Sequence, residues 1–459
     1  MFTYQDFLAA ENKVKWISQA IASYMRSEAY KLALDADEYE AQRNVTINKY
    51  VKLVYDITGV AVVDPKSANN RIASNFFHRL NTDRCQYSLG NGVSFPGVES
   101  VDENGKKITI DDTKEALGNT FDTELTQAAY FALIHGVSFL FSNDTTYHVF
   151  PMTQFLPLWD EIDGTLKAGI RFWSIEWRRK PIQAVVYEED GYTKYQTAPG
   201  KYGLGALQLL EEKRPYKQTV QISEADGEEV VGGSNYGSLP IVPVYACKAK
   251  QSTLVGLRAH IDAYDMIQSG FANDLQDCAQ VYWIINNALG MDQNDIAKLR
   301  DRLLFQHVAA IDADNSSLTP YTQEIPYNAR MAALDGIRSA MYENFGVLDV
   351  HTVEAGATND HIEAGYQPMD QEADDFEYQI IQAVQQILHI KGLEPKVPQF
   401  KRNRISNQKE QTEMVMMAAQ YLDEETLLNK LPFLTVDEIP KVLAANDKSA
   451  ADRFRTVEE

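Results

Sequence analysis

The feature that most constrains the fold is a pair of long amphipathic segments in the second half of the chain. From residue 258 to 278 apolar side chains recur at steps of three and four, and polar side chains occupy the other faces. The same spacing returns from residue 331 to 348. Matched stripes favour two helices that pack together, and an ordinary core hairpin accounts for the pattern taken alone. The stripes are Ile261, Tyr264, Ile267, Phe271, Leu275 and Cys278, then Met331, Leu334, Ile337, Met341, Phe345 and Leu348.

The segments around this helical pair differ in type. Between the helices, residues 282–326 combine short apolar runs with a predicted short helix that carries basic residues. After the second helix, residues 351–367 contain two glycines and several charges, which predicts a long loop. Asp370 is then expected to cap another helix, which ends at Gly392. The remainder is predicted to be helical, with a charged tail.

The first half of the chain changes character along its length. Helices are expected up to about residue 89, and the stretch from about 137 to 247 is β-rich. Asp190-Gly191 stands between two strand-like runs and predicts a tight hairpin, as does Asn104-Gly105. Residues 211–237 are polar and predict a surface excursion, and the prolines of 239–244 suit an edge strand. We therefore expect an α+β fold, mainly helical with an antiparallel β-rich part.

Charge narrows the possible functions. The chain has 43 basic and 65 acidic residues, so its formal net charge is 43 − 65 = −22. A protein that grips nucleic acid by neutralising phosphates needs a basic surplus, so this class is excluded. No apolar run reaches the ~18 residues that cross a bilayer, and the start lacks the pattern of a signal peptide, which predicts an intracellular protein without a membrane partner. Cys85, Cys247 and Cys278 are widely spaced and are expected to be reduced packing residues.

No catalytic motif is found, so no enzyme activity and no cofactor is predicted. HExxH, GxSxG and phosphate-loop spacings are absent from the sequence. The best enzyme alternative is a glycosidase-like site at Asp160 and Glu161, beside Trp159 and near Trp173 and Trp177. The opposing interpretation is a plain turn between strands. The histidines and carboxylates of 351–363 lack a fixed metal-binding geometry, and a solvated loop is favoured there.

Several segments resemble the portal proteins of long-tailed bacteriophages. The first match runs from Asn69-Asn70-Arg71-Ile72 to Arg84-Cys85-Gln86-Tyr87-Ser88-Leu89-Gly90-Asn91. The second consists of Gly136-Val137-Ser138-Phe139-Leu140, Val149-Phe150-Pro151 and Phe155-Leu156-Pro157-Leu158-Trp159-Asp160, which also absorbs the glycosidase candidate. The most specific match joins Leu239-Pro240-Ile241-Val242-Pro243 to Ile261-Asp262-Ala263-Tyr264-Asp265 and Phe271-Ala272-Asn273-Asp274-Leu275. A fourth lies at Asn403-Arg404-Ile405, Thr426-Leu427-Leu428, Pro432-Phe433 and Val436-Asp437-Glu438.

The resemblance implies a domain order. Residues 1–250 would form the wing, 251–281 the first stem helix, 282–326 a small α/β clip, and 327–349 the second stem helix. Residues 350–369 would form the tunnel loop, 370–405 the long wing helix and a strand, and 406–459 a helical crown with the C-terminal tail. It also implies a ring of twelve subunits at one capsid vertex of the virion, assembled in the host cytoplasm.

The resemblance further implies partners and site residues. The partners would be double-stranded DNA, which passes through the ring during packaging and ejection, the terminase large subunit, the head-tail adaptor, and the major capsid and scaffolding proteins. An acidic enzyme or a non-viral scaffold is the alternative. The tunnel-loop residues facing DNA would be His351, Thr352, Glu354, Thr358, Asn359, Asp360 and His361. Limited phosphate contacts would come from Lys298, Arg300, Arg302, Arg330 and Arg338, and stem packing from Ile261, Tyr264, Phe271, Leu275, Leu334, Ile337, Met341 and Phe345.

Overall fold

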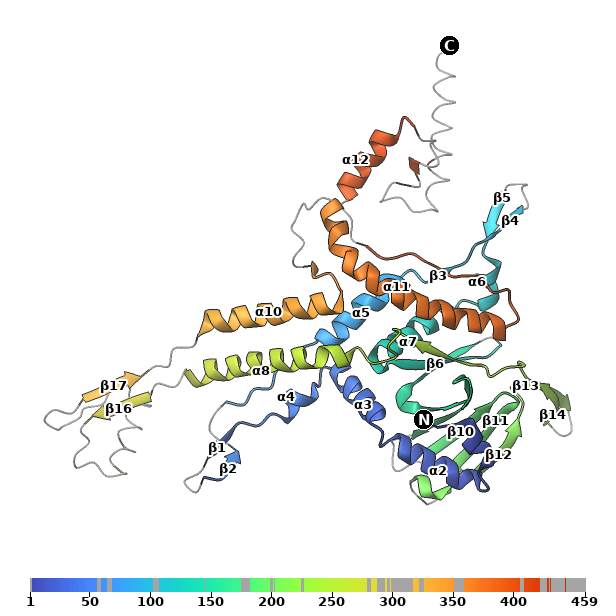
Figure 1. Ribbon diagram of the computed structural model, residues 1–459, viewed down its shortest axis with the longest axis horizontal. Helices are drawn as coiled ribbons and strands as arrows, with labels where there is room; N and C mark the ends of the chain where they lie inside the picture. Colours follow the sequence, from blue (N-terminus) through green and yellow to red (C-terminus); the bar gives the residue numbers. More distant parts are fainter. Residues whose placement is uncertain are drawn as a thin grey trace, which may run out of the picture. The chain divides into compact units, whose positions relative to one another are not determined.

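The computed structural model describes most of the chain and divides it into two compact units. The described residues are 2–55, 59–63, 68–101, 107–144, 146–174, 182–198, 201, 203–223, 227–278, 282–286, 317–321, 326–350, 359–404 and 408–421, with positions 294, 298, 427, 428, 430 and 442. The first unit comprises Met1–Glu40, Phe76–Leu257 and Tyr342–Glu459, and the second comprises Ala41–Asn75 and Arg258–Met341. Helices and antiparallel sheets are mixed throughout, as predicted (Figure 1).

The first unit contains a five-stranded antiparallel sheet in the order β12-β11-β10-β9-β8. Its strands are β8 (Phe155–Trp159), β9 (Leu166–Ser174), β10 (Ile182–Glu188), β11 (Gly191–Thr197) and β12 (Leu207–Arg214). The predicted hairpin is confirmed, because β10 pairs with β11 and Glu188 lies opposite Gly191. Gly191 has a φ of +141°, and a Cβ there would meet the carbonyl oxygen of Arg214 at 2.3 Å. Only glycine therefore fits this turn.

A second sheet of three strands, in the order β15-β6-β7, lies in the same unit. It consists of β6 (Val137–Ser142), β7 (Tyr147–Pro151) and β15 (Ile241–Tyr245). The prediction of an edge strand near Pro243 is confirmed, since β15 pairs on one side only, with β6. The polar stretch 211–237, predicted to be a surface excursion, holds the end of β12 and a separate hairpin of β13 (Lys217–Ser223) and β14 (Gly227–Ser234).

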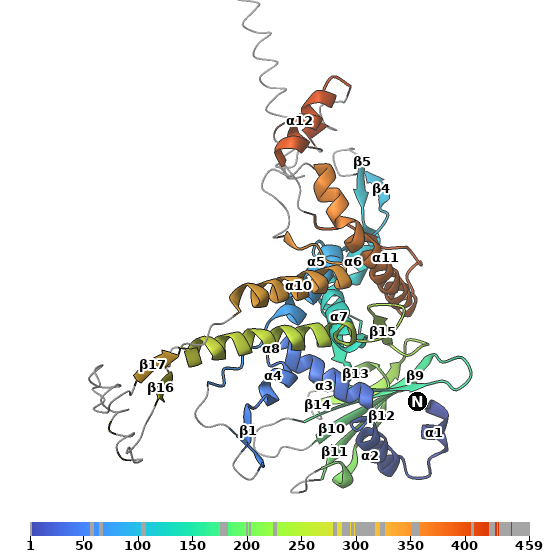
Figure 2. The ribbon, with the colours of Figure 1, turned by 60° about the vertical axis from the view of Figure 1, so that its left-hand side comes forward.

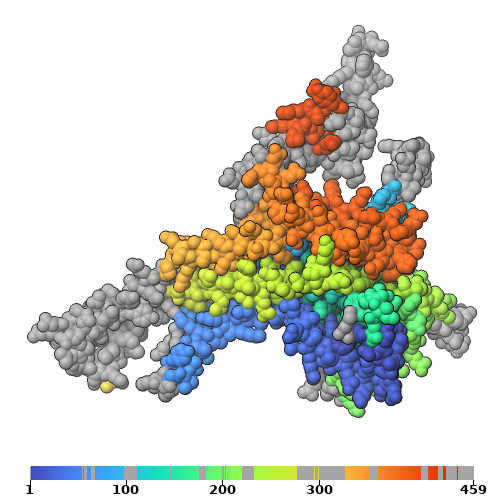
Figure 3. Space-filling view, viewed as in Figure 1, coloured from blue at the N-terminus to red at the C-terminus, as the bar shows by residue number. Residues whose placement is uncertain are grey.

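The chain begins with three helices, of which the first two and the start of the third pack against the five-stranded sheet (Figure 2), and Figure 3 shows their residues in dark blue. These are α1 (Tyr4–Ala9), α2 (Lys13–Tyr24) and α3 (Glu28–Glu40). Ile17 and Ile21 of α2 are fully buried with Leu156, Ile170 and other residues of the sheet. Helix α1 starts at an N-cap, where the side chain of Thr3 accepts a hydrogen bond from the backbone N–H of Asp6.

The other large core of the first unit lies around two long helices, α7 (Phe121–His135) and α11 (Asn359–Ile390). Helix α5 (Phe76–Leu89) contributes Cys85 and Leu89 to it. Cys85 is a free buried thiol, which agrees with the predicted packing role. Burial raises its pKa to about 12. The first unit also contains α6 (Asp112–Leu117), α12 (Gln408–Ala418), short turns at Met152–Gln154 and Leu204–Ala206, and strand pairs β3 (Val93–Ser94) with β18 (Gln399–Phe400) and β4 (Val98–Val101) with β5 (Lys107–Ile110).

Helix α11 corrects the predicted loop of 350–369. It begins at Asn359 and continues through Pro368, so Asp370 lies inside the helix and does not cap it. Residues 351–358 are outside the described part of the chain. The helix forms in spite of Gly365 and Pro368 because its buried side chains recur at alternating steps of four and three residues. They are Ile362, Tyr366, Met369, Ala373, Phe376, Ile380, Ala383, Ile387 and Ile390.

The second unit is built on two long helices that run side by side in both ribbon views, α8 (Leu254–Cys278) and α10 (Tyr327–Phe345) (Figures 1 and 2). The chain leaves α8 into β16 (Tyr282–Asn286) and returns through β17 (Ser317–Tyr321), which pairs with it. The rings of Phe271 and Tyr327 lie 5.8 Å apart, and Arg330 of α10 forms an ion pair with Asp274 of α8.

The stripes of these helices differ from the predicted ones. Ile261, Leu334, Met341 and Phe345 are buried, whereas Tyr264, Phe271 and Ile337 are partly buried and Leu275 is 53% exposed. The buried face of α8 instead continues from Ile261 into polar residues, Asp265, Ser269 and Asn273. Each of these three hydrogen-bonds the segment 70–74, which therefore runs extended along the helix before α5 begins.

A small exposed hairpin belongs to the same unit. Strands β1 (Leu53–Tyr55) and β2 (Ala61–Val63) pair with each other after the short helix α4 (Val45–Lys49). Their apolar side chains face solvent in the single chain, with Tyr55 78% and Val63 59% exposed. The hairpin is rooted by Arg71, which donates to the carbonyl of Asn48 at 2.7 Å, and by Asn44, which donates to the carbonyl of Ser74 at 3.1 Å.

Within the described ranges, no helix is both long and apolar enough to cross a bilayer.

Candidate functional site

The structure defines both ends of the segment to which the tunnel-loop residues were assigned. On one side α10 ends at Phe345, where Gly346 has a φ of +69° and the N–H of Val347 donates to the carbonyl of Tyr342 at 3.1 Å. Gly346 thus ends the right-handed helix with one residue in the left-handed conformation. A Cβ at position 346 would meet Cγ of Glu372 at 2.8 Å. On the other side α11 begins at Asn359.

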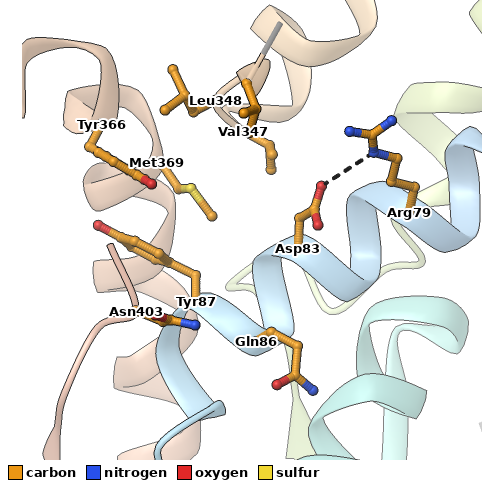
Figure 4. A pocket seen from close by; sticks show the side chains of 10 residues that line it. Arg79, Asp83, Gln86, Tyr87, Val347, Leu348, Tyr366, Met369 and Asn403 are labelled. Atoms are coloured by element: carbon orange, nitrogen blue, oxygen red, sulfur yellow. Dashed lines mark ion pairs between the residues drawn. The ribbon is translucent and has the colours of Figure 1, made fainter. Parts of the chain in front are cut away.

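A cavity of about 220 Å³ lies where these ends meet α5 (Figure 4). Leu348, Tyr366 and Met369 face it from the side of α10 and α11, and Asp83 and Tyr87 face it from α5. Asp83 lies 3.9 Å from Arg79, and burial raises its pKa in spite of this neighbour. The residues that flank the segment 351–358 therefore border a partly apolar cavity. It is also lined by Arg79, Gln86, Val347, Val350 and Asn403.

Tyr87 links this cavity to a network of charged residues. Its ring stacks on that of Tyr366, with centroids 5.6 Å apart and planes 9° apart. Its hydroxyl donates to Asp370 at 2.7 Å and accepts from Nε of Arg404 at 2.9 Å. Burial, together with the bond to Asp370, raises the pKa of Tyr87 to about 12. The hydroxyl is thus held neutral as a donor to the carboxylate.

Arg402 completes the network along α11. It donates to Asp370 at 2.8 Å and to both oxygens of Glu377 at 2.9 Å, and it also pairs with Asp374. The bonds to Glu377 are the largest of the causes that raise the pKa of Arg402. Burial pushes the pKa of Asp370 up, yet the bonds from Tyr87, Arg404 and Arg402 outweigh it and leave that pKa lowered. Charge-assisted bonds of this kind fix the chain after β18 to one face of the helix.

Arg84 fastens the same helix to the end of α10. Its guanidinium donates to the carbonyl of Phe345, lies 3.9 Å from the centre of that ring, and is 3.2 Å from Glu372. Burial lowers the pKa of Arg84, and Glu372 opposes this effect. Arg84 of α5 and Glu372 of α11 therefore hold the chain at Phe345, shortly before the segment 351–358.

The predicted site residues fall into three groups. His351, Thr352, Glu354 and Thr358, with Arg300 and Arg302, lie outside the described residues. Asn359, Asp360 and His361 occupy the first turn of α11, so these three belong to a helix and not to the predicted loop. Among the proposed phosphate contacts, Lys298 is exposed, Arg330 is bound to Asp274 and lies over Phe271, and Arg338 faces Tyr264.

The glycosidase candidate has the structure of a turn at Asp160, and its Trp177 lies outside the described residues. Asp160 accepts backbone N–H bonds from Ile162 at 2.8 Å and Asp163 at 3.4 Å, which is the geometry of a turn. These bonds, led by that from Ile162, lower the pKa of Asp160. Glu161 accepts from the hydroxyl of Thr3 at 2.9 Å. The described residues also contain no group of three or more side chains suited to a metal ion.

The sequence did not predict that Arg84, Tyr87, Arg402 and Arg404 all bind carboxylates of α11. Arg84 and Tyr87 lie within the first segment that resembles portal proteins. Their contacts with α11 are remote in sequence, since Asp370 lies 283 positions after Tyr87. The basic pair at 402 and 404, following three acids of α11 on one helical face, was the only signal available.

Comparison with known proteins gives several similarities. The chain is 24% identical over 461 residues to the portal protein of Clostridium phage phiCD119, covering 94% of this chain and 98% of the relative. It is 22% identical over 338 residues to the portal protein of Bacillus phage SPP1, covering 71% and 63%. Among solved structures, a chain from the neck of a native GTA particle computed with C12 symmetry has a TM-score of 0.39 and 10% identity, covering 79% of this chain and 91% of that one. The neck of an empty GTA particle computed with C6 symmetry gives a TM-score of 0.37 and 12% identity, covering 81% and 90%.

A family model matches residues 30–452, nearly the whole chain. The match assigns the chain to a class, that of phage portal proteins, which are structural components of the virion. Within that class the chain belongs to the family described as phage portal protein, SPP1 Gp6-like.

Proposed function

We propose that this chain assembles into a closed ring of twelve subunits at one capsid vertex and that double-stranded DNA passes through the ring during packaging and ejection. The family match over residues 30–452 carries this proposal. The pair α8 and α10 supports it, since a long two-helix element can line a channel when it is repeated around an axis. Residues 1–250 are the wing in this proposal, 251–281 and 327–349 the stem, 282–326 the clip, 350–369 the tunnel-loop region, 370–405 the long wing helix and strand, and 406–459 the crown.

The tunnel-loop region is proposed to face the DNA. Asp360 and His361 stand in the first turn of α11, directly after the segment 351–358 that contains the other proposed contacts. DNA carries one charge per ~1.7 Å of axis, so a bore without a strong basic surplus lets it slide. The net charge of −22 per chain agrees with such a conduit. Lys298, Arg300, Arg302, Arg330 and Arg338 would supply only limited phosphate contact.

Further partners are proposed from family membership. The chain contains no Walker motif, so the energy for packaging has to come from another protein, which we propose is the terminase large subunit docking near the clip. The head-tail adaptor would bind the same end of the ring after packaging, and the major capsid and scaffolding proteins would surround it in the host cytoplasm.

Ring formation is tested by native mass spectrometry and negative-stain electron microscopy of the purified chain. Closed rings with a central hole are expected, and a strict monomer at high concentration would contradict the proposal. The tunnel-loop role is tested by exchanging residues 352–358 for a glycine-serine linker of equal length, with residues 224–226 exchanged as the control. Ring formation should persist in both variants, and packaging of full-length genomes should fall in the first only. Equal packaging by both would refute the role of the loop.

A further inference from the structure

An aromatic cavity lies in the β-rich part of the first unit, far along the chain from the segment 351–358. Its volume is about 510 Å³, which is within the range of ligand sites. One wall comes from the three-stranded sheet and the other from β9 to β12 of the five-stranded sheet. We call it the aromatic cavity and define it by the rings of Phe141, Phe150, Trp173, Tyr187, Tyr192 and Tyr216.

These rings pack against one another, which makes the walls rigid. The ring centres of Tyr187 and Tyr216 are 6.5 Å apart with planes 3° apart, and those of Phe141 and Phe150 are 6.0 Å apart with planes 15° apart. Tyr216 donates its hydroxyl to the carbonyl of Glu188 at 2.6 Å. The cavity is therefore preorganised for an apolar or aromatic group.

Arg171 is the cation of this cavity. Its guanidinium carbon lies 4.3 Å from the ring centre of Phe150 and 4.7 Å from that of Trp173, and its Nε atom is buried without a hydrogen-bond partner. Arg84, Arg330 and Arg402 each have a carboxylate within ion-pair distance. Within the described ranges Arg171 has none.

The other charges at the cavity are already paired. Lys194 of β11 contacts both carboxylate oxygens of Glu211 of β12, at 3.3 and 3.2 Å. Glu211 also lies 3.5 Å from Arg214, so this carboxylate is engaged by two other cations, and within the described residues Arg171 is left without one. A guanidinium held against aromatic faces binds a carboxylate strongly, because its planar donors match the two oxygens.

Strand β12 borders the cavity and offers an edge with which a peptide can pair. It is the edge strand of its sheet, and its Leu209 and Leu210 are 47% and 50% exposed. Leu210 also lines the cavity. An extended peptide can pair with such an open edge and place alternate side chains in the adjoining pocket.

We propose that the aromatic cavity binds an extended acidic segment of a partner protein, with a carboxylate on Arg171 and the aromatic side chain two residues further along among the tyrosines. The charge complementarity with Arg171 selects an acidic segment, and the free edge of β12 selects a peptide. This site is separate from the proposed channel and does not depend on the passage of DNA.

The test uses two peptides that differ in one group, Ser-Glu-Thr-Phe-Ser and Ser-Gln-Thr-Phe-Ser, both with blocked ends and 4-fluorophenylalanine, in which the acid and the aromatic ring share one face of an extended chain. Binding to the full chain is followed by fluorine NMR and calorimetry, with the oligomeric state of each sample measured by native mass spectrometry. The glutamate peptide should bind at least tenfold more tightly than its glutamine twin, in line with one charge-assisted pair. Equal binding of the two peptides, or binding of neither, would overturn the proposal.

Variants locate the site. Arg171→Gln should remove the preference for glutamate, while the exposed Arg26→Gln should retain it. Leu210→Glu places a negative charge at the exposed mouth of the cavity and should weaken the glutamate peptide severalfold even if Arg171→Gln fails to fold. A preference unchanged in Leu210→Glu and in folded Arg171→Gln would refute the site. Binding by monomers but not by rings would assign the cavity to a second copy of this chain and would also overturn the proposal.

Discussion

Single arginines tie together parts of the chain that are remote in sequence. Arg402 bonds three carboxylates of α11, with its side chain only 21% exposed. Tyr87 and Arg404 meet at one of them, Asp370. Local patterns predict helices well, but the partner of a given charge depends on tertiary packing, so the sequence pointed to the helices and not to this network.

Replacing Arg402 by glutamine should therefore lower stability clearly. Several charge-assisted bonds disappear and partly buried carboxylates lose their counter-ion, which costs about 2 kcal/mol. The apparent midpoint of thermal unfolding measures this. Arg79→Gln is the matched control, because its pair with Asp83 is 3.9 Å long and exposed, and such pairs contribute below about 0.5 kcal/mol. Equal losses in both variants would contradict the role of the network.

Asp265 gives a pH-dependent prediction. Burial raises its pKa, although Asn44 and Ser74 donate to it. An acid whose pKa is higher in the folded state binds its proton there first, so the wild type gains stability as pH falls through this raised pKa towards the unfolded value of about 3.9. Asp265→Asn lacks this gain. The stability difference between wild type and variant should shift towards the wild type on acidification from pH 7 to 4, as followed by hydrogen exchange of residues 258–278. A difference independent of pH would contradict this account.

Helix boundaries show where periodicity prevails over single residues. The pattern of α8 and α10 predicted both helices within a few residues, whereas the two glycines and the charges of residues 351–367 wrongly suggested a loop where α11 begins. The helix is stabilised by the buried alternation from Ile362 onwards, because each large apolar side chain in it contributes about 1.5 to 3 kcal/mol on burial. On α8, Asp265 and Ser269 read as a solvent face, since nothing local reveals that residues 70–74 cover them.

The end of α10 can be tested with two glycine variants of opposite sign. Gly346→Ala should destabilise by about 1 to 2 kcal/mol, because a left-handed conformation disfavours a Cβ and Glu372 stands in its way. Gly336→Ala, in the middle of α10 with open space around it, should stabilise by up to about 1 kcal/mol. Chemical denaturation of both variants measures this. A stabilised Gly346→Ala would refute the helix end described here.

Across the whole molecule, charge governs the proposed assembly. Each subunit brings a net charge of −22, so twelve of them repel one another over distances that salt screens. Raising ionic strength from 50 to 500 mM should therefore lower the subunit concentration at which rings form, as measured by mass photometry. A ring that dissociates with added salt would show that attractive ion pairs between subunits dominate. Composition alone supports this prediction, while the units and their sheets required the family resemblance or the structure.

The hairpin of β1 and β2 has a consequence for the life of the free subunit. Leu53, Tyr55, Val62 and Val63 are exposed, and no other described strand pairs with either edge of the hairpin, so it can serve as a template for pairing with another chain. In a newly made chain, assembly with other subunits therefore competes with aggregation through this hairpin. Slow synthesis at low temperature, with few unassembled chains present at once, favours the first outcome.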